Sequence, residues 1–209
     1  MNGNIKKQKL LLVEGIDEIN FFKALFANLA ILDIQVIESK GKDQFPAELN
    51  LIVNDPNFVN VNSIGIVRDA DNSQMSAIQS IRYNLEKHGL PKNANHGEFD
   101  EKDGVKVGIF IAPGFKEDGM LESLVLESLK GHPVKEAADH YINNLRSELE
   151  SESNTSQYKF PNNEAKARMH AFLSGMEKFV PSLGIASTKG YFDLNSEVFN
   201  DIKEFLRKI

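Results

Sequence analysis

The alternation of short apolar runs with amphipathic segments constrains the fold of this chain most strongly. Three runs, KLLLVEG at 9–15, SIGIV at 63–67 and VKVGIFIAPG at 105–114, are typical of strands buried on both faces. A fourth short strand, IQVIES, is expected at 34–39. Segments with apolar residues at helical spacing separate these runs. Strands that alternate with helices predict βαβ units and a mainly parallel sheet flanked by helices.

The rest of the chain is expected to be mostly helical. Helices are expected over residues 17–30, 43–55 (beginning near Pro46), 73–89, 118–131, 133–150, 163–179 and 195–209. Residues 91–104 are rich in turn formers and indicate a loop or a short hairpin arm. The polar stretch SESNTSQ, 151–157, is typical of a linker. We therefore expect an α/β domain over 1–150 and a mostly helical C-terminal extension over 151–209 that packs on it.

Composition limits the classes of protein that this chain can belong to. Its 209 residues are 41% hydrophobic and 26% charged, which is ordinary for a globular protein with a core. The absence of cysteine excludes disulfides and zinc–thiolate sites. No secretory signal and no membrane-length apolar run are visible, so a cytoplasmic protein without a membrane partner is expected. A net charge of −6 argues against non-specific binding of nucleic acid.

Acidic residues stand where two of the predicted strands end. Glu14 closes the first strand, and Asp69 and Asp71 follow the third in the stretch GIVRDADNS. Ligands of open α/β sheets bind beyond the carboxyl ends of the strands, so these acids converge if the strands are neighbours. The Asp-x-Asp spacing is expected to aim both side chains in a similar direction. Clustered carboxylates repel one another, and Mg²⁺ or Mn²⁺ relieves that repulsion, which favours phosphoryl-transfer chemistry.

Each acid also has a purely structural interpretation. Asp71, Asn72 or Ser73 can cap the helix that follows, as such residues commonly do. Glu18 lies in the first turn of a helix, where the helix dipole favours an acid in any case. The order of strand-ending Glu-Gly and strand-ending Asp-x-Asp within βαβ units is what favours a metal site.

The stretches LLLVEGIDE and IGIVRDADNS together resemble the Toprim domain of topoisomerases, bacterial primases and OLD (overcoming lysogenization defect) nucleases. The resemblance covers roughly residues 8–130. In that family a glutamate after the first strand and an Asp-x-Asp after the third hold Mg²⁺. The resemblance therefore implies a Toprim-like Rossmannoid fold, with Glu14, Asp69 and Asp71 in the metal site.

Two further acids match parts of this family. Glu18 matches the position of a second acidic residue in the OLD nucleases, which lies one turn into the first helix. The segment that contains Gly119, Leu121 and Glu122 resembles a Gly-x-Leu-Glu of stand-alone Toprim-like proteins, whose function is not established. The resemblance thus implies that Glu18 and Glu122 complete a second metal position. The chain departs from better-known relatives because it has no phosphate-binding Gly-x-x-x-x-Gly-Lys loop and no zinc-binding cysteines.

The leading hypothesis is a Mg²⁺-dependent phosphodiesterase that acts on nucleic acid. Glu14, Asp69 and Asp71 would form its centre, and Lys189, on a predicted loop, would assist by binding phosphate. Lys166 and Arg168 are second candidates for that role, and a solvated lysine is the alternative for each. The five histidines show no ligand spacing and are expected to be surface or capping residues.

Two other classes remain open. A non-catalytic regulatory module would use the same fold to bind a nucleotide or a protein partner, because fold alone does not fix activity. A phosphatase is suggested by the similarity of DADNS to the Asp-x-Asp-x-Thr/Ser motif of haloacid dehalogenase-type enzymes. That motif follows the first strand in those enzymes and the third strand here, which disfavours the phosphatase.

Overall fold

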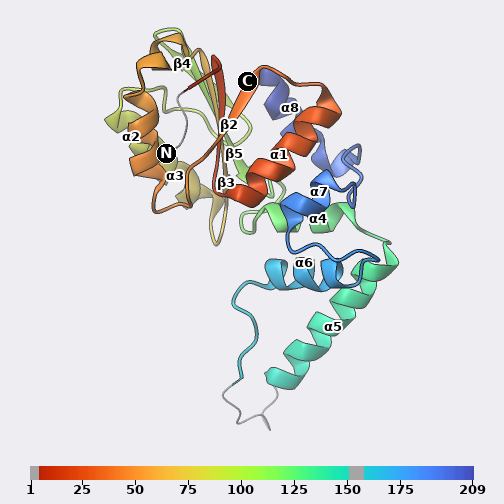
Figure 1. Cartoon of the computed structure of the whole chain (residues 1–209). Coiled ribbons are helices and arrows are strands. Elements are labelled where there is room, and N and C mark those ends of the chain that lie inside the picture. The colour runs from red at the N-terminus through yellow and green to blue at the C-terminus, as the bar shows by residue number, and fades with distance from the viewer. Residues whose placement is uncertain (1–4, 151–157) are drawn as a thin grey trace.

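A computed structural model describes residues 5–150 and 158–209 (Figure 1). Within them, one five-stranded sheet forms the centre of the molecule, and its strands are β1 (Lys9–Val13), β2 (Ile34–Glu38), β3 (Ser63–Asp69), β4 (Phe99–Lys102) and β5 (Val105–Ala112). The strand order is β2-β1-β3-β5-β4. All pairs are parallel except β4 with β5, which are antiparallel. The predicted α/β fold with a mainly parallel sheet is confirmed.

The described residues also form the helices α1 (Ile16–Leu29), α2 (Phe45–Val53), α3 (Gln74–Lys87), α4 (Leu121–Ser128), α5 (Pro133–Leu149), α6 (Glu164–Ser174), α7 (Leu183–Thr188) and α8 (Asn200–Lys208). Two short 3₁₀ helices, Pro56–Asn60 and Glu197–Phe199, complete the described part. Helices α2 and α3 lie on one face, and α1, α4, α7 and α8 lie on the other (Figure 1). The helical C-terminal part that the sequence predicts is therefore present.

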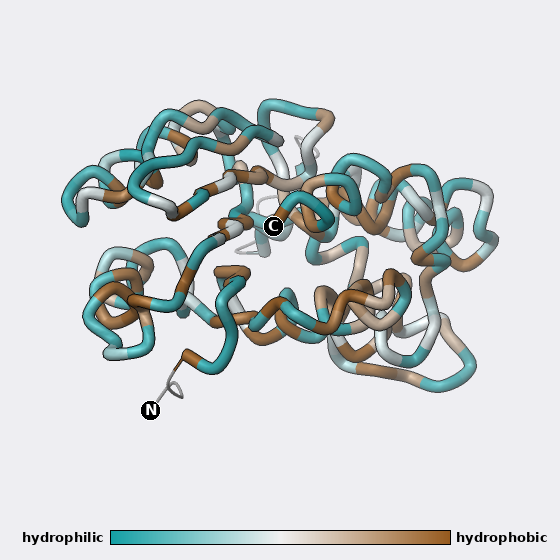
Figure 2. The backbone as a smooth tube through the Cα atoms, turned by 90° about the horizontal axis from the view of Figure 1, so that it is seen from above, coloured by the Kyte–Doolittle hydropathy of each residue, from teal (hydrophilic) through white to brown (hydrophobic). Residues whose placement is uncertain are grey.

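The two faces of the sheet carry separate hydrophobic cores, which explains the uninterrupted apolar strands. Leu11 and Val13 pack among helices α1 and α4–α8, whereas Leu10 and Leu12 pack against α2 and α3. Successive side chains of a strand point to opposite faces, so a strand covered on both sides must be apolar throughout. Figure 2 shows hydrophobic stretches crossing the middle of the molecule, with hydrophilic segments predominating outside.

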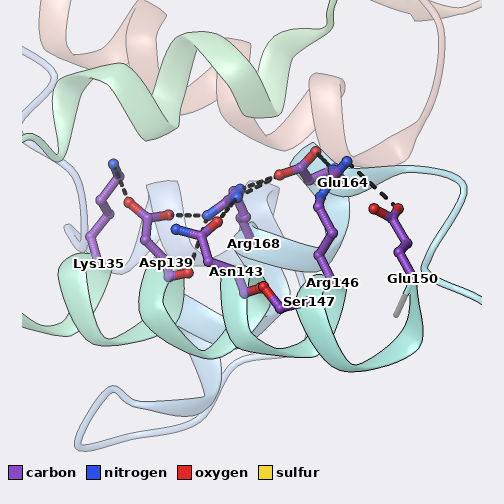
Figure 3. A network of polar contacts seen from close by, with 8 residues as sticks. All are labelled: Lys135, Asp139, Asn143, Arg146, Ser147, Glu150, Glu164 and Arg168. Carbon is purple, nitrogen blue, oxygen red and sulfur yellow. Dashed lines mark hydrogen bonds and ion pairs between the residues drawn. The ribbon is translucent and has the colours of Figure 1, made fainter. Parts of the chain in front are cut away.

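A network of polar contacts joins α5 to α6, which project together from the body of the molecule (Figures 1 and 3). Arg168 of α6 lies at its centre and donates hydrogen bonds to Asp139, at 2.8 Å, and to Asn143, at 2.6 Å, on α5. Arg168 also bonds Glu164, which in turn is paired with Arg146. Charge pairing rather than a deep apolar seam therefore fixes much of the angle between these helices, since α5 buries only Ala138 and Ile142.

Several local predictions need correction. The helix predicted over 163–179 ends at Ser174, because Gly175 follows as its C-cap residue. Helix α7 was not predicted at all. Residues 99–102 form strand β4, so the hairpin alternative for 91–104 is the correct one. The predicted linker 151–157 lies outside the described residues.

His96 is half-buried and has a contact that the sequence did not suggest: it packs beside Phe110, and its Nδ1 accepts the Ile111 N–H at 3.0 Å. Burial lowers its pKa. His132, by contrast, does cap α5, since its Nδ1 accepts the N–H of Val134. Within the described ranges, no helix combines the length and apolar character needed to cross a membrane.

Candidate functional site

Strands β1 and β3 are parallel neighbours, so the acids at their ends meet. Glu14 directly follows β1 and Asp69 is the last residue of β3. The Glu14 Oε1 accepts the backbone N–H of Asp69 at 3.2 Å. The Asp69 Oδ1 accepts the N–H of Leu121, the first residue of α4, at 2.9 Å. The expected convergence at this edge of the sheet is confirmed for these two residues.

Two helix starts bring further carboxylates to the same place. Glu18 lies in the first turn of α1 and Glu122 in the first turn of α4. Gly15 leaves room for this arrangement, since a Cβ there would lie 3.1 Å from the Glu18 Oε2. The resulting pocket has a volume of about 480 Å³, and we call it the acidic pocket. Its lining consists of Glu14, Gly15, Ile16, Asp17, Glu18, Glu38, Lys40, Gly41, Asp69, Glu122 and Lys166.

Burial and mutual repulsion make these carboxyl groups unusually easy to protonate. Burial, followed by repulsion from Glu14, Glu122 and Glu18, raises the pKa of Asp69 well above its usual range. Burial also raises the pKa of Glu18, and its acidic neighbours add to that effect. The pKa of Glu122 is raised mainly by burial and is partly restored by Lys166. The carboxylates of the acidic pocket therefore carry more negative charge than the protein groups around them stabilise.

Basic side chains border the acidic pocket on two sides. The Nε of Arg68 lies 3.5 Å from the Glu14 Oε1, and the Arg68 side chain is only 6% exposed. Lys166, on α6, lies 3.9 Å from the Glu122 Oε1 and is half exposed. An exposed ammonium beside a group of carboxylates can receive a phosphate without itself being buried. Lys166, one of the second candidates of the sequence, thus lines the acidic pocket, as does Lys40.

Asp71 does not lie in the acidic pocket, contrary to the expectation that both acids of Asp-x-Asp share one direction. Its φ of 51° is left-handed, and its backbone exchanges two hydrogen bonds with Gly119. The Asp71 carboxylate is paired with Lys42 at 2.8 Å. This local turn directs Asp71 into the neighbouring pocket, which Asp69 also lines. The cap of α3 is Ser73, whose Oγ accepts the N–H of Ser76.

The structure places two other predicted residues away from the acidic pocket. Lys189 lies in the turn directly after α7, as its C-cap residue, and it is exposed and not among the residues that line the acidic pocket. Arg168 belongs to the network between α5 and α6.

Two acids that sequence reasoning did not assign to the site, Asp17 and Glu38, do line the acidic pocket. Glu38 is the last residue of β2, which pairs with β1, so the strand-end rule that selected Glu14 would have found it.

The carboxylate groups of the acidic pocket are of the kind that binds a hard divalent cation, but they do not converge on one point. Carboxylate oxygens are the donors that Mg²⁺ and Mn²⁺ prefer. Within residues 5–150 and 158–209, however, no three His, Cys, Asp or Glu side chains stand in an arrangement that would hold a metal ion. A cation would therefore require Glu14, Glu18, Asp69 or Glu122 to turn toward a shared point. The repulsion that raises the pKa of Asp69 favours that movement once positive charge is supplied.

Fold and site together define an α/β protein with carboxylates gathered at the ends of neighbouring parallel strands. The chain belongs to a family described as "protein of unknown function (DUF3226)", whose model matches residues 8–209. The search among curated proteins finds no match to this sequence.

Two solved structures share the fold along nearly the whole chain. A hypothetical protein from Pyrococcus horikoshii OT3 is 17% identical with a TM-score of 0.61, covering 98% of this chain and 95% of the other. The C-terminal region of the Burkholderia pseudomallei OLD protein is 16% identical with a TM-score of 0.50, covering 98% of each chain. At these identities the likeness concerns the fold.

Proposed function

We propose that this protein is a Toprim-type nuclease that hydrolyses phosphodiester bonds of nucleic acid with Mg²⁺ or Mn²⁺. One observation carries the proposal: Glu14, Glu18, Asp69 and Glu122 line a single pocket at the ends of β1 and β3. Burial raises the pKa of Glu18, Asp69 and Glu122, and acidic neighbours in the same pocket raise it further, an arrangement that added positive charge would stabilise.

Three features support the choice of a nuclease. The sequence stretches around Glu14 and Asp69 resemble the Toprim domain, which the OLD nucleases contain. The fold likeness to the C-terminal region of an OLD protein agrees with that resemblance. The pocket is also open and polar rather than deep and apolar, which suits a polymer backbone better than a drug-sized molecule.

The position of each residue indicates its role in the proposed reaction. Glu14 and Asp69, fixed by the sheet, would hold the cation, and Glu18 and Glu122 would complete its ligands or hold a second cation. Asp71 would contribute only after release from Lys42. Lys166, beside Glu122, would bind the phosphate of the substrate electrostatically. A bound cation would supply neutralisation of charge on the phosphate and a lowered pKa of water.

The test is a cleavage assay with single-stranded DNA, duplex DNA and RNA, each with Mg²⁺, with Mn²⁺ and with EDTA. We expect metal-dependent cleavage of at least one substrate by the wild type and its loss in Asp69→Asn. Asp103→Asn is the matched control. Asp103 is exposed in the turn before β5, whereas Asp69 lies beside Ala112 at the other end of β5. Cleavage by Asp69→Asn at the wild-type rate would exclude the assigned site.

A non-catalytic module that binds a nucleotide or a protein partner is the second candidate. The open arrangement of the carboxylates among the described residues favours it, because a resident cation would need side-chain movement. No cleavage under any of the conditions above, together with wild-type binding of a metal–nucleotide complex, would select this module.

A further inference from the structure

A second pocket lies directly beside the acidic pocket, on the side of α3. We call it the Arg68 pocket; its volume is about 230 Å³. It is lined by Lys42, Arg68, Asp69, Ala70, Asp71, Asn72, Ser73, Ser76 and Ala77. Because Asp69 lines both pockets, a single polymer strand can reach the two at once.

Arg68 is a buried cation with incomplete hydrogen bonding. Its side chain is 6% exposed, and its NH1 donates to the Ser80 Oγ at 3.3 Å. Within the part of the chain that the structure describes, its buried Nε has no hydrogen-bond partner, because Glu14 is 3.5 Å away. Buried donors are almost always satisfied, and a buried charge is expensive without partners. Glu14 thus offsets the charge of the guanidinium, but the Arg68 Nε still lacks a hydrogen-bond acceptor.

The other groups around the Arg68 pocket also suit an anion. Helix α3 begins there and has 14 residues, so its N-terminus carries a partial positive charge. The hydroxyl-bearing Ser73 and Ser76 belong to this first turn. Lys42 contributes an exposed ammonium group, and its hydrogen bond to Asp71 raises the pKa of Lys42.

Two carboxylates also line this pocket, and both are already engaged. Asp71 is covered by Lys42 at 2.8 Å. The Asp69 Oδ1 accepts the N–H of Leu121. A guanidinium fork can hold two oxygens of one phosphate, a geometry that neither carboxylate offers to the Arg68 Nε in the described chain.

We propose that the Arg68 pocket binds a phosphate group of the nucleic-acid strand, adjacent to the phosphate that is held at the acidic pocket. Arg68 would contact two phosphate oxygens, with Ser76 and the start of α3 as further donors and Lys42 as a mobile charge. This inference rests on the proposed function for the identity of the strand. The Arg68 pocket would then set the register of the substrate, and a strand without a phosphate at that position would bind less tightly.

The test measures binding of a fluorescent single-stranded DNA oligonucleotide by anisotropy at several salt concentrations. Ca²⁺ replaces Mg²⁺, because it neutralises carboxylates with a looser coordination geometry. We expect Arg68→Gln and Lys42→Gln each to weaken binding about tenfold, since charge-assisted hydrogen bonds are lost. Each should also reduce the slope of log affinity against log salt by about 0.7, the loss of one single-strand phosphate contact. Lys42 is exposed, so its variant keeps the test valid if the Arg68 variant does not fold.

Lys87→Gln is the matched control. It removes the same charge from the last residue of α3, about 20 Å from the first turn of that 14-residue helix. This variant should bind as the wild type does. Inorganic phosphate is the second probe, added as a competitor of the labelled oligonucleotide. If it competes as well as an unlabelled oligonucleotide at the same concentration of phosphate groups, the pocket binds free phosphate and not a strand.

The outcomes separate this inference from the nuclease proposal. Wild-type cleavage with unchanged binding in Arg68→Gln and Lys42→Gln would overturn only the Arg68 pocket as a phosphate site. Weakened binding in both variants without cleavage by the wild type would support the phosphate site and overturn the nuclease. Absence of wild-type binding to the oligonucleotide would overturn the phosphate site as well.

Discussion

Replacing Asp69 by asparagine should stabilise the metal-free protein, although it removes the proposed function. The Asp69 carboxyl is buried among Glu14, Glu18 and Glu122, which together with burial raise its pKa. Asparagine keeps the shape and an oxygen that can accept the Leu121 N–H, but it removes the charge. Relief of strain at such sites commonly yields about 1–2 kcal/mol. For a chain of this length that corresponds to a rise in Tm of about 2–8 °C in EDTA at neutral pH.

The pH dependence of this difference follows from the direction of the pKa shift. The ordinary pKa of an aspartate side chain is about 3.9, and the pKa of Asp69 in the folded protein lies well above it. The folded protein therefore binds more protons than the unfolded chain between these two values, and its stability falls as pH rises through that window. The advantage of Asp69→Asn should vanish below about pH 4 and reach its full size above the folded pKa of Asp69.

Thermal unfolding of the wild type, Asp69→Asn and the control Asp103→Asn in EDTA across pH 4–8 measures this directly. Asp103→Asn should stay within about 0.5 kcal/mol of the wild type, since its carboxylate is exposed. A lower Tm for Asp69→Asn than for the wild type at neutral pH would refute the reasoning, because the carboxylate would then be stabilised rather than strained. Adding Mg²⁺ at 100 times its Kd should stabilise the wild type and Asp103→Asn by about 2.7 kcal/mol, and should not stabilise Asp69→Asn.

Three further predictions concern the surroundings of the site. Lys166→Ala should slow cleavage about 10–100-fold at unchanged Tm, whereas Lys189→Ala should cleave at the wild-type rate. Equal loss of cleavage rate in the two variants would contradict the role of Lys166 at the acidic pocket. Gly184→Ala should lower the free energy of unfolding by about 1–3 kcal/mol in denaturant titrations, since its Cβ would lie 2.5 Å from the Asp17 carbonyl oxygen; an unchanged midpoint would show that α7 can shift. Arg168→Ala should speed limited proteolysis within α5 and α6, with Arg168→Lys intermediate because a lysine lacks the guanidinium fork; identical digestion would mean that the network does not hold the two helices together.

The fold was predictable because its strands are buried on both faces. Such strands read as uninterrupted apolar runs, and the alternation of these runs with helices specifies a parallel sheet. The approach of Glu14 to Asp69 followed from the same pattern, once the two strands were taken as neighbours. The same strand-end rule applies to Glu38, at the end of β2, which was not assigned to the site because no motif around it resembles a known metal site.

The predictions that were wrong depend on local backbone geometry and on tertiary packing. Asp71 lies outside the acidic pocket, and its left-handed backbone bridges to Gly119, 48 positions later. Helix α7 has the sequence LGIAST, whose glycine, isoleucine and hydroxyl residues disfavour helix in isolation. It forms because Gly184 lets it pack closely against α1. Such contacts join distant segments, and no periodicity of the sequence reports them.

Calorimetric titration of Mg²⁺ and Mn²⁺ into the wild type and Asp69→Asn, each with and without a single-stranded oligonucleotide, tests the central claim most directly. The acidic pocket is proposed to hold the cation, so the wild type should bind at least one of these ions, more tightly with the oligonucleotide present. Asp69→Asn should lose that binding while keeping its fold. Equal binding by both proteins, or no binding by the wild type even with the oligonucleotide, would contradict a metal site at the ends of β1 and β3.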